Sequence, residues 1–156
     1  PDRDTPHGLP FFSGERATGW AADAKAVLTG VSTDTTALDL WYGVIESIAV
    51  SYERIWEQLD DAGASPTRVI ASGSVTTDYP TWLQVLANAL GVDVIPLEMK
   101  RATLRGTALI ALDVVDPGGE RAVPPFGEPF RYQPEHEDYY AGVRAEFDRT
   151  YDALVD

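Results

Sequence analysis

The sequence predicts an α/β fold in which helices pack on a mostly parallel sheet. Three observations support this prediction: short apolar runs bounded by glycine or proline, longer segments with apolar residues at steps of three and four, and the alternation of the two along the chain. The chain has 156 residues, a length that suits a single domain with a sizeable core. No internal repeat is found, so residues 1–156 are expected to form one domain.

The first half of the chain predicts one short strand and one long helix. The strand is expected within residues 24–32, ending at Gly30. The helix is expected over residues 36–61 after an N-cap at Asp34 or Thr35, because apolar side chains recur there at helical spacing. Four aromatic residues lie on its apolar stripe, and we expect them to be mostly core, with a part forming an interface left open in this chain: Trp41, Tyr42, Tyr52 and Trp56.

The second half alternates more regularly between strands and helices. The expected elements are a strand at 68–72, a helix from Pro80 to the residue before Gly91, a strand at 92–97, a helix at 102–115, a loop at 117–134 and a closing helix at 136–156. The closing helix carries an apolar stripe formed by Tyr140, Val143, Phe147, Tyr151 and Leu154.

Composition excludes several classes of function. The net charge is -13 and the isoelectric point is about 4.4, which argues against nucleic acid and against an anionic membrane surface as partners. Cysteine is absent, so disulfides and thiolate metal sites are excluded. The two histidines, His7 and His136, lack metal-ligand spacing and are expected to be solvated. No signal peptide or membrane-length apolar run is found, so a cytoplasmic location is expected.

The turn from Ala71 to Tyr79 is the strongest candidate for a binding site. Gly73 follows a strand directly, which would let a ligand approach the backbone closely. The amide groups that enter the helix at Pro80 could face an anion or the edge of a nucleotide. Hydroxyl groups are supplied by Ser72, Ser74, Thr76 and Thr77. The alternative is an ordinary connection, which the local residues alone favour, because one glycine is not a G-x-G-x-x-G fingerprint.

A second candidate is the stretch "FSGER", residues 12–16. Glu15 and Arg16 beside Gly14 could brace a neighbouring domain without taking part in chemistry. The alternative is a surface ion pair that contributes well under ~1 kcal/mol.

Several stretches, taken together and in order, resemble the FGGY carbohydrate kinases. "LPFFSGERATGWAADAKAVLTGVS" resembles the family's Gly-Glu-Arg and tryptophan stretch, and "ALDLWYGVIESIA" resembles the helix that follows it. "IASGSVTTDYPTWLQVLANALGVDVIPLE" is similar to the family's Gly-Gly turn and Trp-x-Gln-x-x-Ala-Asp segment. "ATLRGTALIAL" resembles its Ala-x-x-x-Gly-Ala-Ala helix and leans towards gluconate kinase-like members. The resemblance covers most of residues 8–154.

The resemblance implies a ribonuclease H-like, actin-like ATPase domain that forms the C-terminal half of a two-domain sugar kinase. In that family the Gly-Gly turn lies against the adenosine of ATP. Gly73 takes the first glycine position and Ser74, a departure from the family, takes the second. The residues that would follow along the nucleoside are Val75 and one of Thr77 or Asp78. At the family's aspartate position stands Asn88, which keeps the size and loses the charge.

The resemblance also implies the function. The full-length protein would transfer the γ-phosphate of ATP to a hydroxyl of a sugar or sugar acid such as gluconate or xylulose, with Mg²⁺. The phosphate loop and the catalytic base are expected upstream of Pro1, in an N-terminal domain that this chain lacks, so the chain alone is expected to be inactive and to hold no catalytic or metal-binding residue. The polar opening and the absence of an initial Met fit a chain cut from a longer one or processed by proteolysis. A homodimer is possible. The alternative function is a non-enzymatic actin-like module that binds a nucleotide or a protein.

Overall fold

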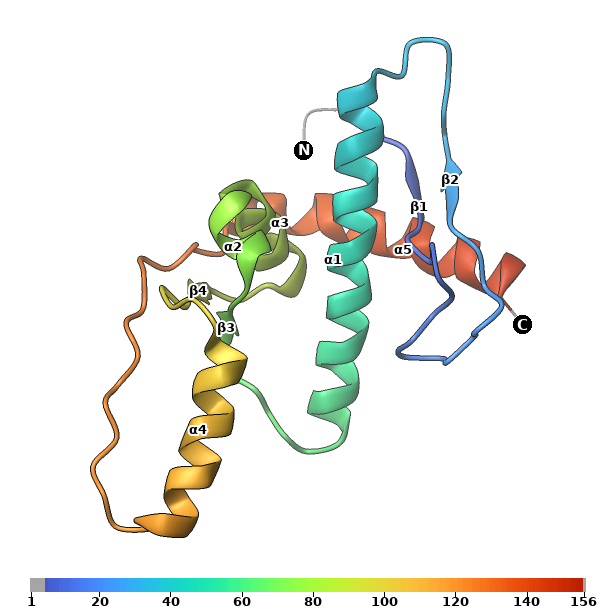
Figure 1. The fold of residues 1–156 in the computed structure, drawn as a ribbon. Coiled ribbons are helices and arrows are strands. Elements are labelled where there is room, and N and C mark those ends of the chain that lie inside the picture. The colour runs from blue at the N-terminus through green and yellow to red at the C-terminus, as the bar shows by residue number, and fades with distance from the viewer. Residues whose placement is uncertain (1–4, 156) are drawn as a thin grey trace.

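The computed structural model describes residues 5–155, the side chain of Thr77 excepted. Its elements are β1 (His7–Leu9), β2 (Val27–Thr29), α1 (Ala37–Asp61), β3 (Val69–Ala71), α2 (Ser74–Asp78), α3 (Pro80–Leu90), β4 (Val94–Pro96), α4 (Ala102–Val115), a 3-10 turn (Pro134–His136) and α5 (Glu137–Leu154). In Figure 1, α1 stands in the middle, with β1 and β2 on one side and β3, β4, α2 and α3 on the other, while α5 crosses the molecule and α4 projects from it.

Helix α1 ends at Asp61 as its sequence predicts, but it begins one residue later than expected, at Ala37. Thr36 caps the helix, not Asp34 or Thr35: its hydroxyl accepts the Asp39 amide at 3.2 Å, and the Asp39 carboxylate accepts the Thr36 amide at 2.9 Å. This reciprocal capping box satisfies two amides that would otherwise lack partners.

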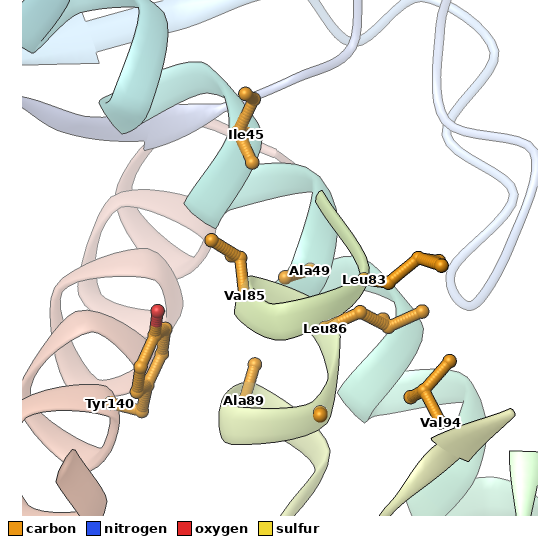
Figure 2. Packing of buried hydrophobic residues seen from close by; sticks show 9 residues of the cluster. Ile45, Ala49, Leu83, Val85, Leu86, Ala89, Val94 and Tyr140 are labelled. Carbon is orange, nitrogen blue, oxygen red and sulfur yellow. The ribbon is translucent and has the colours of Figure 1, made fainter. Parts of the chain in front are cut away.

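Helix α3 packs between α1 and α5 and supplies most of the main core. Pro80 occupies its first turn and Gly91 ends it in the left-handed conformation, as the sequence predicts. The buried residues of α3 meet those of α1 and α5, and Val94 of β4 joins them; Figure 2 shows Tyr140 of α5 beside α3. A second cluster joins β1, α1 and α5 through Leu9, Phe11, Val50, Val143 and Phe147. The stripe predicted on α5 is buried at its first three positions, whereas Leu154 is 60% exposed.

The strands form two separate pairs, and this differs from the single, mostly parallel sheet that we expected. β3 and β4 are parallel, with Val69 opposite Val94. β1, which the sequence pattern does not reveal, pairs antiparallel with β2, with His7 opposite Thr29. The far edge of β4 is met by short bridges to Phe126 and Phe130. Within residues 5–155, β3 pairs only with β4.

Helix α4 has the bounds predicted from its sequence but none of its residues is buried. It projects away from α1, and the following segment runs back beside it towards α5 (Figure 1). Its large apolar side chains are exposed, in particular Leu104, Ile110, Val114 and Val115.

Candidate functional site

The turn after β3 is built around the backbone of Gly73. This residue has φ 108° and ψ 170°, a combination that is essentially confined to glycine. The residues after it form the short helix α2, where we had expected an open turn. Thr76, which is buried, donates its hydroxyl to the Gly73 carbonyl at 2.6 Å, and its amide donates to the same oxygen at 3.2 Å. One hydroxyl of the predicted set is therefore used to hold the turn.

Two of the amide groups around the start of α3, those of Tyr79 and Trp82, are already paired within the chain and do not face a ligand. Because α2 precedes α3 directly, the amide of Tyr79 donates to the Val75 carbonyl at 3.1 Å and that of Trp82 donates to the Tyr79 carbonyl at 3.0 Å. Pro80, between them, has no amide hydrogen to offer.

The predicted site residues lie together on this turn and on α2. Gly73, Ser74 and Asp78 are exposed, Val75 is 53% exposed, and the backbone of Thr77 belongs to α2. A Cβ placed on Gly73 would meet nothing within 4 Å, so the space in front of this backbone is open to a ligand.

An apolar groove of about 850 Å³ begins at this turn and continues along α1. Its walls come from the aromatic side of α1, from β3 and from α2 and α3. Trp41 lies 6.3 Å from Tyr79 and Tyr52 lies 5.9 Å from Trp82, measured between ring centroids. Trp41 and Tyr52 are 52% and 49% exposed, and Tyr42 and Trp56 are half-buried. The stripe is therefore not mostly core as we expect from the sequence, and the part left open in this chain includes Trp41 and Tyr52.

Asn88 fastens the segment before α5 to α3. Its side-chain oxygen accepts from Gln84 and from the Gln133 amide, both at 3.1 Å, and its NH₂ donates to the side-chain oxygen of Gln133 at 3.1 Å. Nearby, Asp93 accepts the amide of Tyr132 at 3.0 Å, and this bond and Arg131 lower the pKa of Asp93. A carboxylate at position 88 could not donate to Gln133, which gives the amide a physical role here.

Glu15 is buried and does not form the surface pair with Arg16 that we considered. Its carboxylate lies 3.3 Å from the Arg54 guanidinium and accepts the Tyr151 hydroxyl at 2.8 Å. The amides of Thr18 and Ala21 also donate to it, at 3.1 and 3.3 Å. Burial opposes its ionisation, but the bonds from Tyr151 and the backbone amides outweigh burial and lower the pKa of Glu15.

The consequence is that Glu15 organises this domain internally. It joins the loop after β1 to α1 and α5, with Arg54 also lying 4.0 Å from the centre of the Tyr151 ring. Arg16 is exposed. The bracing of a neighbouring domain thus finds no support from Glu15, because its oxygens face partners within the chain.

A second buried carboxylate, Glu46 of α1, was missed from the sequence. It accepts hydrogen bonds from Thr5 at 3.1 Å and from Tyr139 at 2.9 Å. Burial raises the pKa of Glu46, and burial together with this carboxylate raises the pKa of Tyr139 to about 12. The only sequence signal for this role is a glutamate on the apolar side of a helix.

A third group of charges joins α1 to α5. Arg144 donates to both oxygens of Glu57 at 2.8 Å and to Asp148 at 2.8 Å, while Glu53 lies further off at 3.7 Å. One oxygen of Glu53 is buried without a hydrogen bond to any described residue. Burial raises the pKa of Glu53 to about 7. The negative charges of Glu57 and Asp148 also raise this pKa, whereas the positive charge of Arg144 lowers it.

The raised pKa of Glu53 predicts a pH-dependent stability. Because the usual pKa is 4.5 and the folded value is about 7, the folded protein binds the extra proton between these values, and stability falls as pH rises through this range. Glu53→Gln removes the ionisation, so we expect the variant to gain about 1–3 kcal/mol over the wild type between pH 5 and pH 8. Urea unfolding of both proteins at pH 5 and at pH 8 measures this gain. If the difference in free energy of unfolding between the variant and the wild type were the same at both pH values, the raised pKa of Glu53 would be contradicted.

No metal site is found within residues 5–155. These residues contain no group of three or more His, Cys, Asp or Glu able to hold a metal ion. His7, expected to be solvated, lies in β1 with its Nδ1 buried and without a partner among the described residues. None of the described helices is both long and apolar enough to cross a membrane.

Comparison with known proteins assigns the family. Residues 1–112 match the FGGY family of carbohydrate kinases, C-terminal domain. A glycerol kinase of Mycobacterium tuberculosis (H37Ra) is 28% identical over 161 residues, which cover 97% of this chain and 31% of the relative. A xylulose kinase from Rhodospirillum rubrum superposes with a TM-score of 0.82 at 25% identity, covering 96% of this chain and 30% of that structure. A Plasmodium falciparum glycerol kinase with ADP shares the fold, with a TM-score of 0.70 at 19% identity over 90% of this chain and 29% of that one.

The chain therefore belongs to the FGGY family of carbohydrate kinases and corresponds to the family's C-terminal domain. It spans only 29 to 31% of the length of these relatives. The resemblance drawn from the sequence motifs is confirmed.

Proposed function

We propose that this chain is the nucleotide-binding part of an ATP-dependent carbohydrate kinase with an actin-like, ribonuclease H-like architecture. The observation that carries the proposal is the open backbone of Gly73, which stands on a turn whose Ser72, Val75 and Thr76 line an apolar groove, in an FGGY C-terminal domain. A nucleoside has a flat apolar base and a polar ribose, and this turn offers both kinds of surface.

The nucleoside would lie against Gly73 and Ser74 and continue along α2 past Val75 and Asp78. With no Cβ at position 73, the ring can approach the backbone closely. Val75 offers an apolar contact beside the aromatic groove, and the Ser74 hydroxyl stands where a second glycine is expected. Thr77 belongs to the same helix. An adenosine group therefore fits the residues present.

The chemistry itself is assigned to the longer polypeptide. ATP, when bound with Mg²⁺, supplies the γ-phosphate that would pass to a hydroxyl of a sugar or sugar acid, with positioning and charge compensation as the main contributions of the protein. We place no catalytic base and no Mg²⁺ ligand on this chain, and we expect it to be inactive alone. The relatives named above act on glycerol and xylulose, and a gluconate kinase from Lactobacillus acidophilus shares the fold with a TM-score of 0.80. These three are the first substrates to test.

The test is Gly73→Val in the full-length kinase that contains this chain. We expect the Michaelis constant for ATP to rise roughly tenfold or more, because the new side chain occupies the space of the base and strains a backbone suited to glycine. The Michaelis constant for the carbohydrate should change by less than about twofold.

A matched control separates ligand binding from backbone strain. Gly91 also has positive φ and open space around it, but it ends α3 away from the turn. Gly91→Val should lower stability without changing the ATP constant. Equal ATP constants in Gly73→Val and the wild type would refute the assignment of the turn. Absence of phosphate transfer to all three substrates by the full-length wild type would favour the non-enzymatic module.

A further inference from the structure

The backbone conformation of Gly73 is not held in place by packing. A Cβ placed on this residue would meet nothing within 4 Å, so no neighbouring atom on that side restricts the backbone. Glycine has the widest choice of backbone conformations, and a sparsely populated one such as φ 108° with ψ 170° persists only where other contacts determine it. Hydrogen bonds are therefore left to select this conformation.

Thr76 supplies these hydrogen bonds in the reverse of the usual arrangement. A helix N-cap normally uses its side chain to accept an amide of the first turn, but Gly73, the N-cap of α2, has no side chain. Instead the Thr76 side chain reaches back and donates its hydroxyl to the Gly73 carbonyl at 2.6 Å, beside the bond from its own amide at 3.2 Å. A carbonyl oxygen has two lone pairs, so these two donors use it inside the turn and leave it unavailable to a ligand.

The two bonds fix the orientation of a whole peptide plane. The peptide unit between Gly73 and Ser74 is planar, so the direction of the Gly73 carbonyl also determines the direction of the Ser74 amide. This is the backbone against which the nucleoside would lie. A rotation of the plane would displace both residues of that contact surface, although neither of them had been changed.

We propose that Thr76 is a positioning residue for nucleotide binding, because its hydroxyl holds the peptide between Gly73 and Ser74 in the orientation that the nucleoside part of ATP requires. This inference rests on the proposed function, since it takes the turn as the nucleoside-binding surface. Thr76 is only 8% exposed and its hydroxyl is bonded to the backbone, so it acts through the turn and not by touching the nucleotide.

Thr76→Val in the full-length kinase tests the role of the hydroxyl, because valine keeps the shape of the side chain. We expect the dissociation constant of ADP, measured by titration calorimetry, and the Michaelis constant for ATP to rise roughly three- to tenfold, as for the loss of one hydrogen bond. The turnover number and the Michaelis constant for the carbohydrate should change by less than about twofold. Thr76→Ser restores the hydroxyl and should bring both nucleotide constants to within about twofold of the wild type.

Thr150→Val is the matched control for the loss of a buried hydroxyl. Thr150 is 9% exposed in α5 and donates its hydroxyl to the Glu146 carbonyl at 2.8 Å, so a bond of the same kind is lost at the same degree of burial. It follows Phe147, whose cluster joins β1, α1 and α5. We expect Thr150→Val to lower the midpoint of urea unfolding and to leave both nucleotide constants unchanged.

Unchanged nucleotide constants in Thr76→Val, or a rise that Thr76→Ser does not reverse, would overturn the proposal. An equal rise in Thr150→Val would also overturn it, because the effect would then come from general stability. The proposed function is read separately. A wild type that binds ADP but transfers no phosphate contradicts the kinase activity alone, and the ADP constants still decide the role of Thr76. A raised ATP constant in Gly73→Val with an unchanged one in Thr76→Val contradicts the positioning role alone.

Discussion

Replacement of Glu15 by alanine is expected to lower the free energy of unfolding by about 3–5 kcal/mol, because it leaves the largely buried guanidinium of Arg54 without its carboxylate. The Tyr151 hydroxyl and the amides of Thr18 and Ala21 lose an acceptor at the same time. Urea unfolding at pH 7 measures the loss. Because folding lowers the pKa of Glu15, the stabilisation that its carboxylate provides is complete above the usual pKa of 4.5 and is lost as the pH falls below that value.

Arg16→Ala is the matched control for this loss. Arg16 is exposed and adjacent in sequence, so its removal should change stability by no more than about 0.5 kcal/mol. If both variants were equally stable, the prediction that the hydrogen bonds and ion pair of Glu15 stabilise the fold would be contradicted. Glu15→Gln keeps the shape and two hydrogen-bonding groups, and is expected to fall between alanine and the wild type.

Gly43→Ala is expected to destabilise the protein by about 1–3 kcal/mol, although alanine is the better helix former. Gly43 lies in α1, where a Cβ would stand 2.1 Å from the backbone carbonyl oxygen of Pro6. A backbone atom cannot move aside as the end of a flexible side chain can, so α1 and the segment before β1 would have to separate. The midpoint of urea unfolding reports the change.

Gly142→Ala should have the opposite sign. Gly142 lies in α5 and a Cβ there meets nothing within 4 Å, so alanine should stabilise by about 0.5–1 kcal/mol through helix propensity. Stabilisation by both substitutions would show that Pro6 does not approach α1 as closely as the structure has it.

The elements predicted best from the sequence are those fixed by local signals. The long helix, the helix between Pro80 and Gly91, and the helix before Asp116 each have periodicity and clear ends, and their bounds agree with the structure. The sequence does not predict the short helix α2, because Pro80 is a strong signal for a helix start and residues 74–78 are therefore interpreted as the turn that leads into α3. A glycine–threonine hydrogen bond closes α2, and no spacing rule reveals it.

Pairings between distant residues could not be predicted from one sequence. Glu15 has a charged neighbour at position 16, but its side-chain partners, Arg54 and Tyr151, stand 39 and 136 residues away. The aromatic stripe illustrates the same limit for packing. Periodicity shows that one side of α1 is apolar, but it does not show whether other residues cover that side. The turn at Gly73 could be found because its glycine requirement is local.

Helix α4 has a consequence for the colloidal behaviour of this chain. Apolar surface that favours association is exposed on α4, through its leucine, isoleucine and valine side chains, and in the open groove. At low ionic strength the net charge of -13 keeps copies of the chain apart. At about 0.15 M salt the electrostatic repulsion reaches only about 8 Å, so the attraction between the exposed apolar surfaces becomes more important. We therefore expect this chain to associate more as the salt concentration rises, even where its folding stability does not change.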